Sequence, residues 1–358
     1  MKKIISIVGT RPQFIKVAPL HKILQTKYNH LILHTGQHYD ENMSEIFFKQ
    51  FSLKNPDYCL HVGSGNHGEQ SGKMLIEIEK ILIKEKPNLV IVYGDTNSTL
   101  SGILASSKLH IPTAHIEAGM RSFNRGMPEE INRIVADHLS NINFCVTKSS
   151  FNNLVNEGIT KNIHHVGDTM YDTFLQFNLL IKNKKNLLDK YNLVPYKYII
   201  TTIHRASNTE IKSNLTSIIN ALIKSNEKII FPIHPRTKKY LIKYSLINKI
   251  LKSKNIQIIN PIGYLELLTL TKYAKKVVTD SGGVQKEAYF LKVPCITLRD
   301  ETEWIETTEN NWNILVGSDE KKILNGLKNK KKPKKYNLIY GKGDTSNKIM
   351  GYLNKFLK

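Results

Sequence analysis

Short apolar runs alternate with longer amphipathic stretches along this 358-residue chain, and this alternation limits the fold more than any other feature. Apolar runs too short for helices, separated by stretches with helical periodicity, are typical of parallel strands whose sheet is covered on both faces by helices. In the first half we expect strands at residues 4–8, 31–34, 89–93, 113–116, 144–147 and 165–167. In the second half we expect them at residues 198–203, 228–233, 256–259, 277–279, 295–298 and 314–316.

The two strand series predict an α/β chain with two doubly wound domains, each with its own parallel sheet. We place the first domain at residues 1–172 and the second at 173–344, with a polar stretch around 182–189 near the junction. Helical patterns such as 71–84 and 130–139 separate the strands. A further helix is expected at 345–357, where it could pack back on either domain.

The composition, with 41% hydrophobic and 23% charged residues, is typical of a soluble globular protein. No apolar run approaches the roughly 18 to 20 residues that span a bilayer, so we expect no membrane insertion. The apolar run after Lys2 and Lys3 is interpreted as a buried strand, because it is too short for a signal peptide and lacks a cleavage site. Cys59, Cys145 and Cys295 are odd in number and far apart, which favours reduced thiols in the cytoplasm over a disulfide or zinc framework.

The formal net charge of +22 suggests nucleic-acid binding as one possible function. However, the lysines are spread over predicted helices and loops, and the densest run, at residues 328–335, contains Pro333 and no interleaved aromatic residues. We therefore expect no nucleic-acid partner. A basic surface favours instead a phosphorylated, anionic substrate.

Polar motifs follow nearly every predicted strand, and the ligands of doubly wound sheets bind beyond the carboxyl ends of the strands. After the first strand, Gly9 permits a tight turn and Pro12 suits the first turn of a helix. Arg11 and Lys16 would flank the positive end of that helix, where two fixed cations suit a phosphate or a sugar acid. The alternative is a capped helix with two surface cations. Residues 35–40 form the next polar motif.

Three carboxylates are expected at the same sheet edge, because Asp95 and Glu117 follow apolar strands and Glu129 begins a helix. Glu117 should be poorly solvated, which would raise its pKa, whereas the helix dipole would keep Glu129 ionised. Such a pair suits acid–base chemistry. The alternatives are a helix cap for Asp95 and surface salt bridges for the two glutamates. Asp95, His115 and Glu117 could ligate a metal, but no ligand spacing supports a metal site.

The helix expected after Pro128 shows one apolar face, formed by Ile131, Val135 and Leu139. This pattern, with Pro128 near the start, places Glu129 in the first turn of the helix.

In the second half, His204 and His234 each follow a predicted strand, and a protonated histidine can stabilise a departing diphosphate. The stretch KVVTDSGGVQKEAYFL contains a strand, a Ser-Gly-Gly turn at 281–283 and a helix, an order that points backbone N–H groups at an anion. Glu287 lies one turn further on, where its carboxylate could bind ribose hydroxyls. The alternative is a plain turn with a helix N-cap.

Between Gly9 and Gly317 the chain contains, in this order, GTRPQFIK, TGQHYD, GDTNST, HIEAGMRSFNRGMPEEINR, TTIHR, HPRT, TDSGGVQKEA and VPCITLRDETE. Together these segments resemble the non-hydrolysing UDP-N-acetylglucosamine 2-epimerase family. The resemblance implies a glycosyltransferase-B-like fold, in which two Rossmann-like domains form an interdomain cleft for the UDP-sugar. It also implies a homodimer, a C-terminal helix at 345–358 that returns to the first domain, and a reaction that needs neither NAD nor a metal.

The same resemblance implies a role for each matched residue and an inversion at C2 of the sugar. UDP would be eliminated across C1–C2 to give a 2-acetamidoglycal, which rotates and takes UDP back with protonation from the other face. The implied catalytic residues are Asp95, Glu117, Glu129 and His204, and the implied substrate contacts are Arg11, Lys16, Ser281, Gly282, Gly283 and Glu287.

Some segments depart from the family pattern. RPQF stands where the best-known members have RPE, Trp304 stands where a cation near the diphosphate is expected, and no allosteric arginine is evident before Gly72. RPQFIK with DETEWIET is closer to the branch that acts on UDP-2,3-diacetamido-2,3-dideoxyglucuronate for surface polysaccharide. A hydrolysing 2-epimerase, a glycosyltransferase of the same fold and a non-catalytic binder remain as alternatives.

Overall fold

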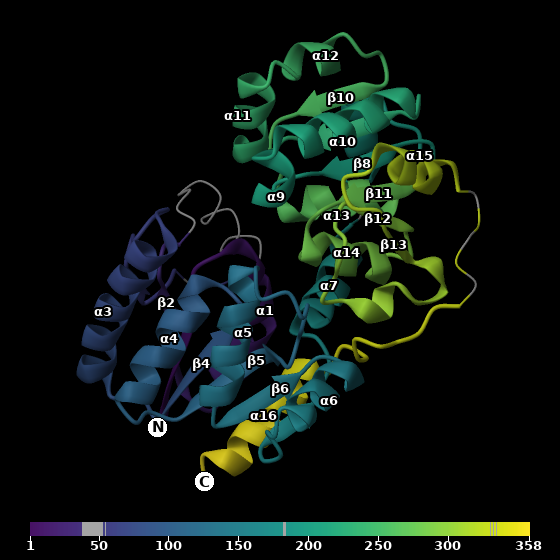
Figure 1. Ribbon diagram of the computed structural model, residues 1–358. Coiled ribbons are helices and arrows are strands. Elements are labelled where there is room, and N and C mark those ends of the chain that lie inside the picture. Colours follow the sequence, from purple (N-terminus) through teal and green to yellow (C-terminus); the bar gives the residue numbers. More distant parts are fainter. Residues whose placement is uncertain (38–52, 54, 182–183, 330, 332, 334) are drawn as a thin grey trace. The chain divides into compact units, whose positions relative to one another are not determined.

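The computed structural model describes residues 1–37, 53, 55–181, 184–329, 331, 333 and 335–358. The chain divides into two compact units: unit 1 contains Met1–Gln176 with Leu338–Lys358, and unit 2 contains Phe177–Asn337 (Figure 1). The motif residues 38–40, part of the stretch at 182–189 and part of the lysine run at 328–335 lie outside the described residues.

Unit 1 is built on a seven-stranded sheet in which every strand pair is parallel, in the order β3-β2-β1-β4-β5-β6-β7. Its strands are β1 (Lys3–Val8), β2 (Asn29–His34), β3 (Tyr58–Cys59), β4 (Leu89–Tyr93), β5 (Thr113–Ala118), β6 (Ile142–Cys145) and β7 (Ile163–His165). Its helices are α1 (Arg11–Leu24), α3 (His67–Glu85), α4 (Asn97–Lys108), α5 (Pro128–Leu139), α6 (Lys148–Asn156), α7 (Thr169–Leu180) and α16 (Thr345–Phe356). The chain passes into unit 2 within α7.

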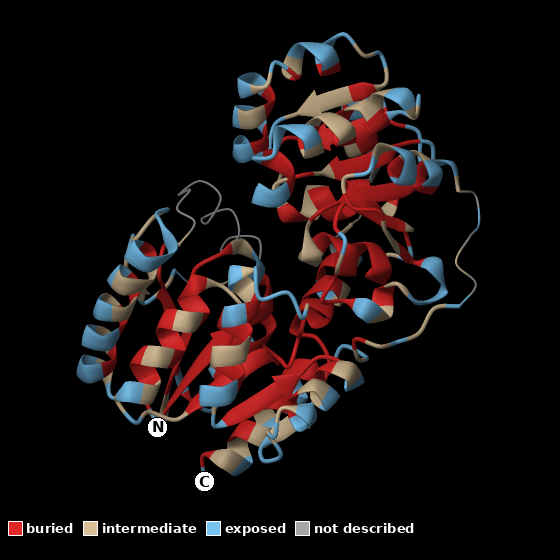
Figure 2. Cartoon of the chain, in the orientation of Figure 1, coloured by how far each residue is buried: buried red, intermediate tan, exposed pale blue. Residues whose placement is uncertain are grey.

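Helices cover both faces of this sheet, because successive side chains of each strand point to opposite sides. Ile5 of β1 belongs to the apolar cluster that includes Ile78 of α3 and Ile103 of α4. Ile4 belongs instead to the cluster that includes residues of α1 and Ile349 of α16. The central strands β1, β4, β5 and β6 are almost entirely buried, whereas helices such as α3 and α5 expose one side (Figure 2).

The C-terminal helix α16 is held to unit 1 by polar contacts as well as by apolar packing. The Asp172 carboxylate accepts hydrogen bonds from the Thr345 and Ser346 backbone N–H groups at 3.2 and 2.7 Å. It thereby pairs two of the N–H groups that a helix start leaves without intrahelical acceptors. At the other end, Lys2 Nζ donates to the Lys358 carbonyl at 3.3 Å, so the two ends of the chain lie together.

Unit 2 is built on a six-stranded parallel sheet in the order β10-β9-β8-β11-β12-β13. Its strands are β8 (Ile199–Thr202), β9 (Ile229–Pro232), β10 (Ile256–Ile259), β11 (Lys276–Thr279), β12 (Cys295–Thr297) and β13 (Asn313–Leu315). Its helices are α8 (Lys184–Lys190), α9 (Ala206–Thr209), α10 (Lys212–Lys224), α11 (Pro235–Lys243), α12 (Ile247–Leu251), α13 (Tyr264–Lys272), α14 (Gly282–Phe290) and α15 (Glu320–Lys328). One apolar cluster contains residues of α10, α11, α12 and α15, and another contains residues of α8, α13 and α14.

A buried lysine closes the end of α15 in unit 2. Lys276 Nζ donates to the carbonyl groups of Gly326, Leu327 and Asn329 at 2.7, 2.8 and 2.6 Å. These are carbonyl groups at a helix C-terminus, where a cation is favourable. Burial, together with the neighbouring Lys275, lowers the pKa of Lys276 to about 8.

The prediction of two doubly wound parallel domains is confirmed, and the expected cleft between them stays a prediction. All the expected strands are present, with shifts of at most two residues. β6 runs from 142 to 145 and not from 144 to 147, and β7 runs from 163 to 165 and not from 165 to 167. The two-residue strand β3 was not predicted, because two residues carry no periodicity.

Two of the apolar residues of α5 lie on its exposed side. Ile131 is 49% exposed and Leu139 is 37% exposed. The buried side of α5 consists mainly of polar residues, namely Glu130, Asn132, Arg133, Ala136 and Asp137. These polar side chains can be buried because partners outside α5 pair with them, as described below.

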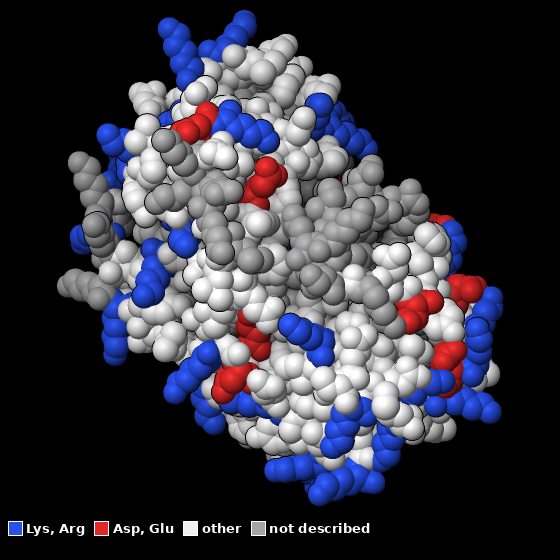
Figure 3. All heavy atoms as spheres, turned by 180° about the vertical axis from the view of Figure 1, so that it is seen from behind, with Lys and Arg blue, Asp and Glu red and all other residues white. Residues whose placement is uncertain are grey.

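The charged side chains are distributed over the surface. Lys and Arg are spread around the face seen in Figure 3 and do not gather at one place. In the described parts of the chain, no helix is long and apolar enough to cross a membrane. Cys59 is exposed, Cys145 and Cys295 are buried, and all three are free thiols.

Candidate active site

The candidate site in unit 1 lies at the carboxyl ends of β1 and β4, the neighbouring strands at which the strand order reverses. Gln13 of α1 connects the turns that follow these strands. Its Oε1 accepts from the Gly9 and Thr10 backbone N–H groups at 2.7 and 3.1 Å. Its Nε2 donates to the Tyr93 carbonyl at 2.8 Å and to the Thr96 hydroxyl at 2.9 Å. One neutral, buried amide therefore sets the spacing of the two turns.

Lys16 lies among the carboxylates and not on the surface. Only 5% of the residue is exposed, and its Nζ lies 2.5 Å from Glu117 Oε1. The same Nζ would lie 2.8 Å from a Cβ placed on Gly94, which has φ +61°. Gly94 is thus required twice, for its left-handed backbone and for the room that it leaves to Lys16. The alternative of a surface cation is wrong for Lys16, and the alternative of a surface salt bridge is wrong for Glu117. Arg11 is the first residue of α1 and is half-buried.

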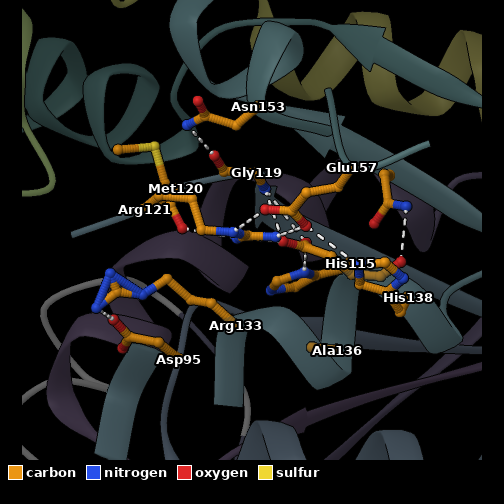
Figure 4. Close-up of polar contacts among 12 residues, drawn as sticks. Asp95, His115, Gly119, Met120, Arg121, Arg133, Ala136, His138, Asn153 and Glu157 are labelled. Atoms are coloured by element: carbon orange, nitrogen blue, oxygen red, sulfur yellow. Dashed lines mark hydrogen bonds and ion pairs between the residues drawn. The ribbon is translucent and has the colours of Figure 1, made fainter. Parts of the chain in front are cut away.

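Asp95 lies near two cations, Arg133 and Lys16, and near the carboxylates of Glu129 and Glu117. Arg133 of α5 turns toward it, with Nη2 3.4 Å from Asp95 Oδ2 (Figure 4). Burial raises the pKa of Asp95; Arg133 and Lys16 oppose this shift, and Glu129 and Glu117 add to it. The side chain keeps 30% of its surface exposed, so a ligand can reach a carboxylate that binds a proton more readily than usual. The capping alternative is wrong, since Thr96 caps α4 by accepting from Thr99 N.

Glu117 has an unusual backbone conformation for a non-glycine residue. Its φ is +74°, at an irregularity in the pairing of β5 with β6. A left-handed residue that lacks glycine's freedom costs on the order of 1 kcal/mol and persists only where its surroundings hold it. The residue is 7% exposed, and its side chain is directed to Lys16. The predicted rise in the pKa of Glu117 stays a prediction.

Glu129 lies in the first turn of α5, as predicted, and is half-buried. Its neighbour Glu130 was not singled out from the sequence. The buried Glu130 carboxylate accepts from the Ser122 and Phe123 backbone N–H groups, each at 2.9 Å. It thus fixes the turn that leads into α5.

The candidate site in unit 2 is built in the same way, at the carboxyl ends of β8 and β11, where that strand order reverses. Here the connecting residue is Asp280, which is fully buried. Its carboxylate accepts from the His204 N–H at 3.0 Å and from the Arg205 N–H at 3.0 Å. His204 Nδ1 lies 3.4 Å from Asp280 Oδ1, and the His204 side chain is 38% exposed. The His234 ring centroid is 5.6 Å from that of His204.

The Ser-Gly-Gly turn at 281–283 begins α14, as predicted. The Ser281 side chain accepts from Val284 N at 3.5 Å, so the residue is also the helix cap that the alternative required. A Cβ on Gly282 would lie 2.5 Å from Glu303 Oε1 and 3.1 Å from Trp304 Nε1. Arg299 Nη1 lies 2.8 Å from Glu303 Oε2. The turn therefore faces a buried charged pair and an indole ring.

Lys286 and Glu287 of α14 are both buried, at 1% and 5% exposure. Lys286 Nζ lies 3.8 Å from the centroid of the Trp304 ring, a cation–π contact. Although Trp304 stands where a cation was expected, this region keeps a positive charge, because Lys286 lies against the Trp304 ring.

The structure brings the predicted residues together in two groups, each within one unit. Lys16, Asp95, Glu117 and Glu129 meet in unit 1, whereas His204 and the α14 residues Gly282, Gly283 and Glu287, with their cap Ser281, belong to unit 2. Sequence reasoning missed the residues that hold these groups in place: Gln13, Arg121, Glu130, Arg133, Asp137, Asp280, Lys286, Arg299 and Glu303. The one available signal was a polar or charged residue within an otherwise buried helix turn or strand end.

A metal site does not arise from the residues that the structure describes, since no three His, Cys, Asp or Glu side chains are arranged to hold an ion. His115 illustrates the reason. Its Nδ1 lies 2.7 Å from Asp137 Oδ1 and its Nε2 lies 2.7 Å from the Gly94 carbonyl oxygen, so both ring nitrogens are engaged in hydrogen bonds.

Residues 22–354 match the family model described as UDP-N-acetylglucosamine 2-epimerase. The chain is 56% identical over 353 residues to a UDP-N-acetylglucosamine 2-epimerase homolog of Methanococcus maripaludis, covering 98% of this chain and 99% of the relative. It is 45% identical over 363 residues to a UDP-2,3-diacetamido-2,3-dideoxy-D-glucuronate 2-epimerase of Pseudomonas aeruginosa, covering 99% of each. The crystal structure of Methanocaldococcus jannaschii UDP-GlcNAc 2-epimerase with UDP-GlcNAc and UDP is similar with a TM-score of 0.93, at 47% identity and 99% coverage of each chain.

Proposed function

Because this chain belongs to the UDP-N-acetylglucosamine 2-epimerase family, we propose that it interconverts UDP-GlcNAc and UDP-ManNAc without hydrolysing them. One observation carries the proposal: Asp95, Glu117, Glu129 and Lys16 lie together at the switch point of unit 1. Their environments differ, since burial raises the pKa of Asp95 while Glu117 forms an ion pair with Lys16. Carboxylates in unlike environments are what a reaction with one proton acceptor and one proton donor needs.

The reaction begins with elimination. A carboxylate takes the proton from C2, the C1–O bond to UDP breaks with its electron pair leaving on the phosphate oxygen, and a C1=C2 double bond forms. The resulting 2-acetamidoglycal rotates, a carboxylic acid protonates C2 on the opposite face, and the phosphate oxygen attacks C1 again. We assign the proton transfers to Asp95, Glu117 and Glu129, and the stabilisation of the leaving diphosphate to His204.

The remaining assignments concern binding. We assign the diphosphate to the helix start formed by Ser281, Gly282 and Gly283, because the N-terminus of a helix of this length presents free N–H groups and a positive dipole. Glu287 is assigned to the ribose. Arg11 and Lys16 are assigned to the substrate on the unit 1 side. The reaction balances without NAD or a metal.

A second candidate substrate is UDP-2,3-diacetamido-2,3-dideoxyglucuronate, which carries an additional carboxylate. The observation in its favour is the DETEWIET segment, in which Trp304 stands over the buried cation Lys286. The Pseudomonas aeruginosa relative named for this substrate is 45% identical to the chain. In this case the product would serve surface polysaccharide.

The test is an incubation of the purified protein in deuterated water, with UDP-GlcNAc and separately with the diacetamido-uronate. Proton NMR follows the loss of the C2 proton signal and the appearance of the manno isomer. We expect exchange at C2 with UDP-GlcNAc; exchange with the uronate alone would select the second candidate. Release of free sugar would indicate a hydrolysing enzyme, transfer to an acceptor a glycosyltransferase, and no exchange with either substrate would refute the epimerase function.

The carboxylate roles are tested with Asp95→Asn and Glu117→Gln. Each substitution should abolish C2 exchange, because it removes a group that accepts or donates the proton, and should leave UDP binding nearly intact, because the diphosphate is assigned to unit 2. Isothermal titration with UDP measures the binding. Full turnover in either variant would contradict the assignment.

We further propose that the protein works as a homodimer in the cytoplasm. Three free cysteines fit a reducing compartment. The polar side of α5 faces inward, and its exposed side carries Ile131 and Leu139. An apolar helix face turned to solvent suits a self-complementary contact between two copies. Light scattering should give twice the monomer mass of 41.0 kDa for the wild type and the monomer mass itself for Ile131→Lys.

A further inference from the structure

A group of four ionisable side chains, three of them buried and the fourth, Glu157, half-buried, lies against the turns that contain Gly94 and Gly119; Figure 4 shows part of it. It consists of His115 on β5, Arg121, Asp137 on α5 and Glu157, and we call it the buried ion group. His115, Asp137 and Arg121 are 0%, 1% and 3% exposed. Arg121 Nη1 lies 2.7 Å from Asp137 Oδ2, and its Nε and Nη2 lie 2.7 Å from the two oxygens of Glu157.

The two hydrogen bonds of His115 define which hydrogens its ring carries. Nδ1 faces Asp137 Oδ1 at 2.7 Å and Nε2 faces the Gly94 carbonyl oxygen at 2.7 Å. A carbonyl oxygen only accepts, and an ionised carboxylate only accepts. Burial by itself would raise the pKa of Asp137, but the charges and hydrogen bonds beside it outweigh burial and lower the pKa. Its two oxygens accept from the Gly119 N–H and from the permanently charged Arg121, which can only donate, so Asp137 is a carboxylate. Both ring nitrogens must therefore donate.

A doubly donating imidazole carries a positive charge, and the charges of the buried ion group then balance. His115 and Arg121 supply two cations, and Asp137 and Glu157 supply two anions. A buried cation without such partners would cost several kcal/mol. At the outer end, His138, whose side chain is 45% exposed, lies 3.1 Å from Glu157 Oε2.

The two turns that carry Asp95 and Glu117 are both hydrogen-bonded to this group. The Gly94 carbonyl, which accepts from His115, belongs to the peptide bond that leads into Asp95. Asp137 also accepts from the Gly119 N–H at 3.1 and 3.2 Å, two residues after Glu117. Gly94, Glu117 and Gly119 all have left-handed φ values, +61°, +74° and +75°, which local sequence alone does not favour for Glu117. The His115–Asp137 pair thus holds two unusual turns in one register.

We propose that His115 is a positioning residue of the epimerase reaction: as a doubly protonated ring it connects Gly94 to Asp137 and so fixes Asp95 and Glu117 relative to each other. This role rests on the proposed function, because the two carboxylates matter only if they exchange protons with a substrate. His115 itself stays out of reach of the substrate, since it is fully buried and both of its nitrogens are occupied.

Two substitutions separate the two hydrogen bonds. In His115→Asn the short amide can replace Nδ1 and still donate to Asp137, but it does not reach Gly94. In His115→Gln the longer amide can replace Nε2 and donate to the Gly94 carbonyl. A displacement of about 1 Å can cost about 10²-fold in rate, so we expect kcat of His115→Asn to fall by about that factor with KM little changed. His115→Gln should recover most of kcat, and the control His138→Asn should match the wild type.

Two further measurements decide the proposal independently of turnover. Proton–nitrogen correlation NMR of the 15N-labelled protein, with His115→Gln to assign the signals, should show both His115 nitrogens protonated at pH 7.5. Deuterium exchange should be faster over residues 93–97 in His115→Asn than in His115→Gln. A single protonated nitrogen in the wild type, or equal kcat and equal exchange in the two variants, would overturn the proposal. An inactive wild type with both nitrogens protonated and protected turns would refute the epimerase function but not the positioning of the turns.

Discussion

Gln13→Met should destabilise unit 1 strongly, although the two side chains have similar length and volume. The Gln13 oxygen is the acceptor for the buried N–H groups of Gly9 and Thr10, at 2.7 and 3.1 Å. Methionine would leave both without an acceptor. A buried N–H that loses its partner costs about 1–3 kcal/mol, so the expected loss is about 2–6 kcal/mol. The Tyr93 carbonyl is less affected, because the Thr99 hydroxyl also donates to it, at 2.6 Å.

The chain allows the two units to be followed separately in one urea titration. Trp304 and Trp312 both lie in unit 2, so tryptophan fluorescence reports that unit. Cys59 of β3 is the exposed thiol among three cysteines, so a thiol-reactive fluorophore attached there reports unit 1. With a urea dependence of about 2 kcal/mol/M, the unit 1 midpoint should fall by about 1–3 M, and the unit 2 midpoint should stay in place.

Gln13→Glu is the matched control, because it keeps the acceptor oxygen and replaces the donating NH2 group by a second oxygen. Its unit 1 midpoint should lie between those of the wild type and Gln13→Met. The argument would be refuted by a Gln13→Met midpoint within about 0.3 M of the wild type, or by a Gln13→Glu variant less stable than Gln13→Met.

The remaining predictions concern unit 2. Gly282→Ala should weaken UDP binding by about 5- to 150-fold in calorimetry, since the added methyl would lie 2.5 Å from Glu303 Oε1 and overpacking of this kind costs about 1–3 kcal/mol. Gly72→Ala is its control, because a methyl there meets nothing within 4 Å, and an equal affinity in both variants would contradict the expected clash. The stability of unit 2 should rise between about pH 8 and 10: Lys276 has a folded pKa of about 8, below the unfolded value of about 10.4, so the unfolded state binds more protons in this window. The rise, up to about 3 kcal/mol by tryptophan-monitored unfolding, should be absent in Lys276→Met; parallel pH curves for the two proteins would show that Lys276 is not its source.

The sheets could be predicted from the sequence because buried parallel strands are locally distinct. β4 (Leu89–Tyr93) and β10 (Ile256–Ile259) coincide with their predicted limits, since each is a short, mainly apolar run bounded by Asn or Gly. The residues that follow such strands were also found, because topology places them at one sheet edge. Asp95, after β4, and Glu117, near the end of β5, are examples, and the structure brings them together.

The side on which α5 is buried could not be predicted, because its packing depends on partners that are distant in sequence. Asp137 is buried since His115 and Arg121 neutralise it, and Arg133 is buried beside Asp95 and Glu130. The apolar spacing of Ile131 and Leu139 does not mark the buried side, since both are exposed. Gln13 was missed for a related reason: it differs from the family pattern by one atom, and its role appears only when the turns after β1 and β4 lie side by side.

The return of the chain to unit 1 has a consequence for the order in which the protein folds during synthesis. Unit 2 is one continuous segment, Phe177–Asn337, and its sheet is complete when that segment has left the ribosome. Unit 1 has to wait for α16, because Ile349 and Leu353 belong to the same apolar cluster as Phe14 and Val17 of α1. Thr345, where α16 begins, follows Leu24, where α1 ends, after 321 positions.

At about 5–20 residues per second, translation of that interval takes about 15–60 s, far longer than helices and loops need to form. In the later part of this time, after β7 has been made, the nascent chain presents the apolar surface of unit 1 that α16 later covers. A ribosome stalled before Thr345 would therefore display a defined binding surface for a chaperone, and completion of α16 would remove it.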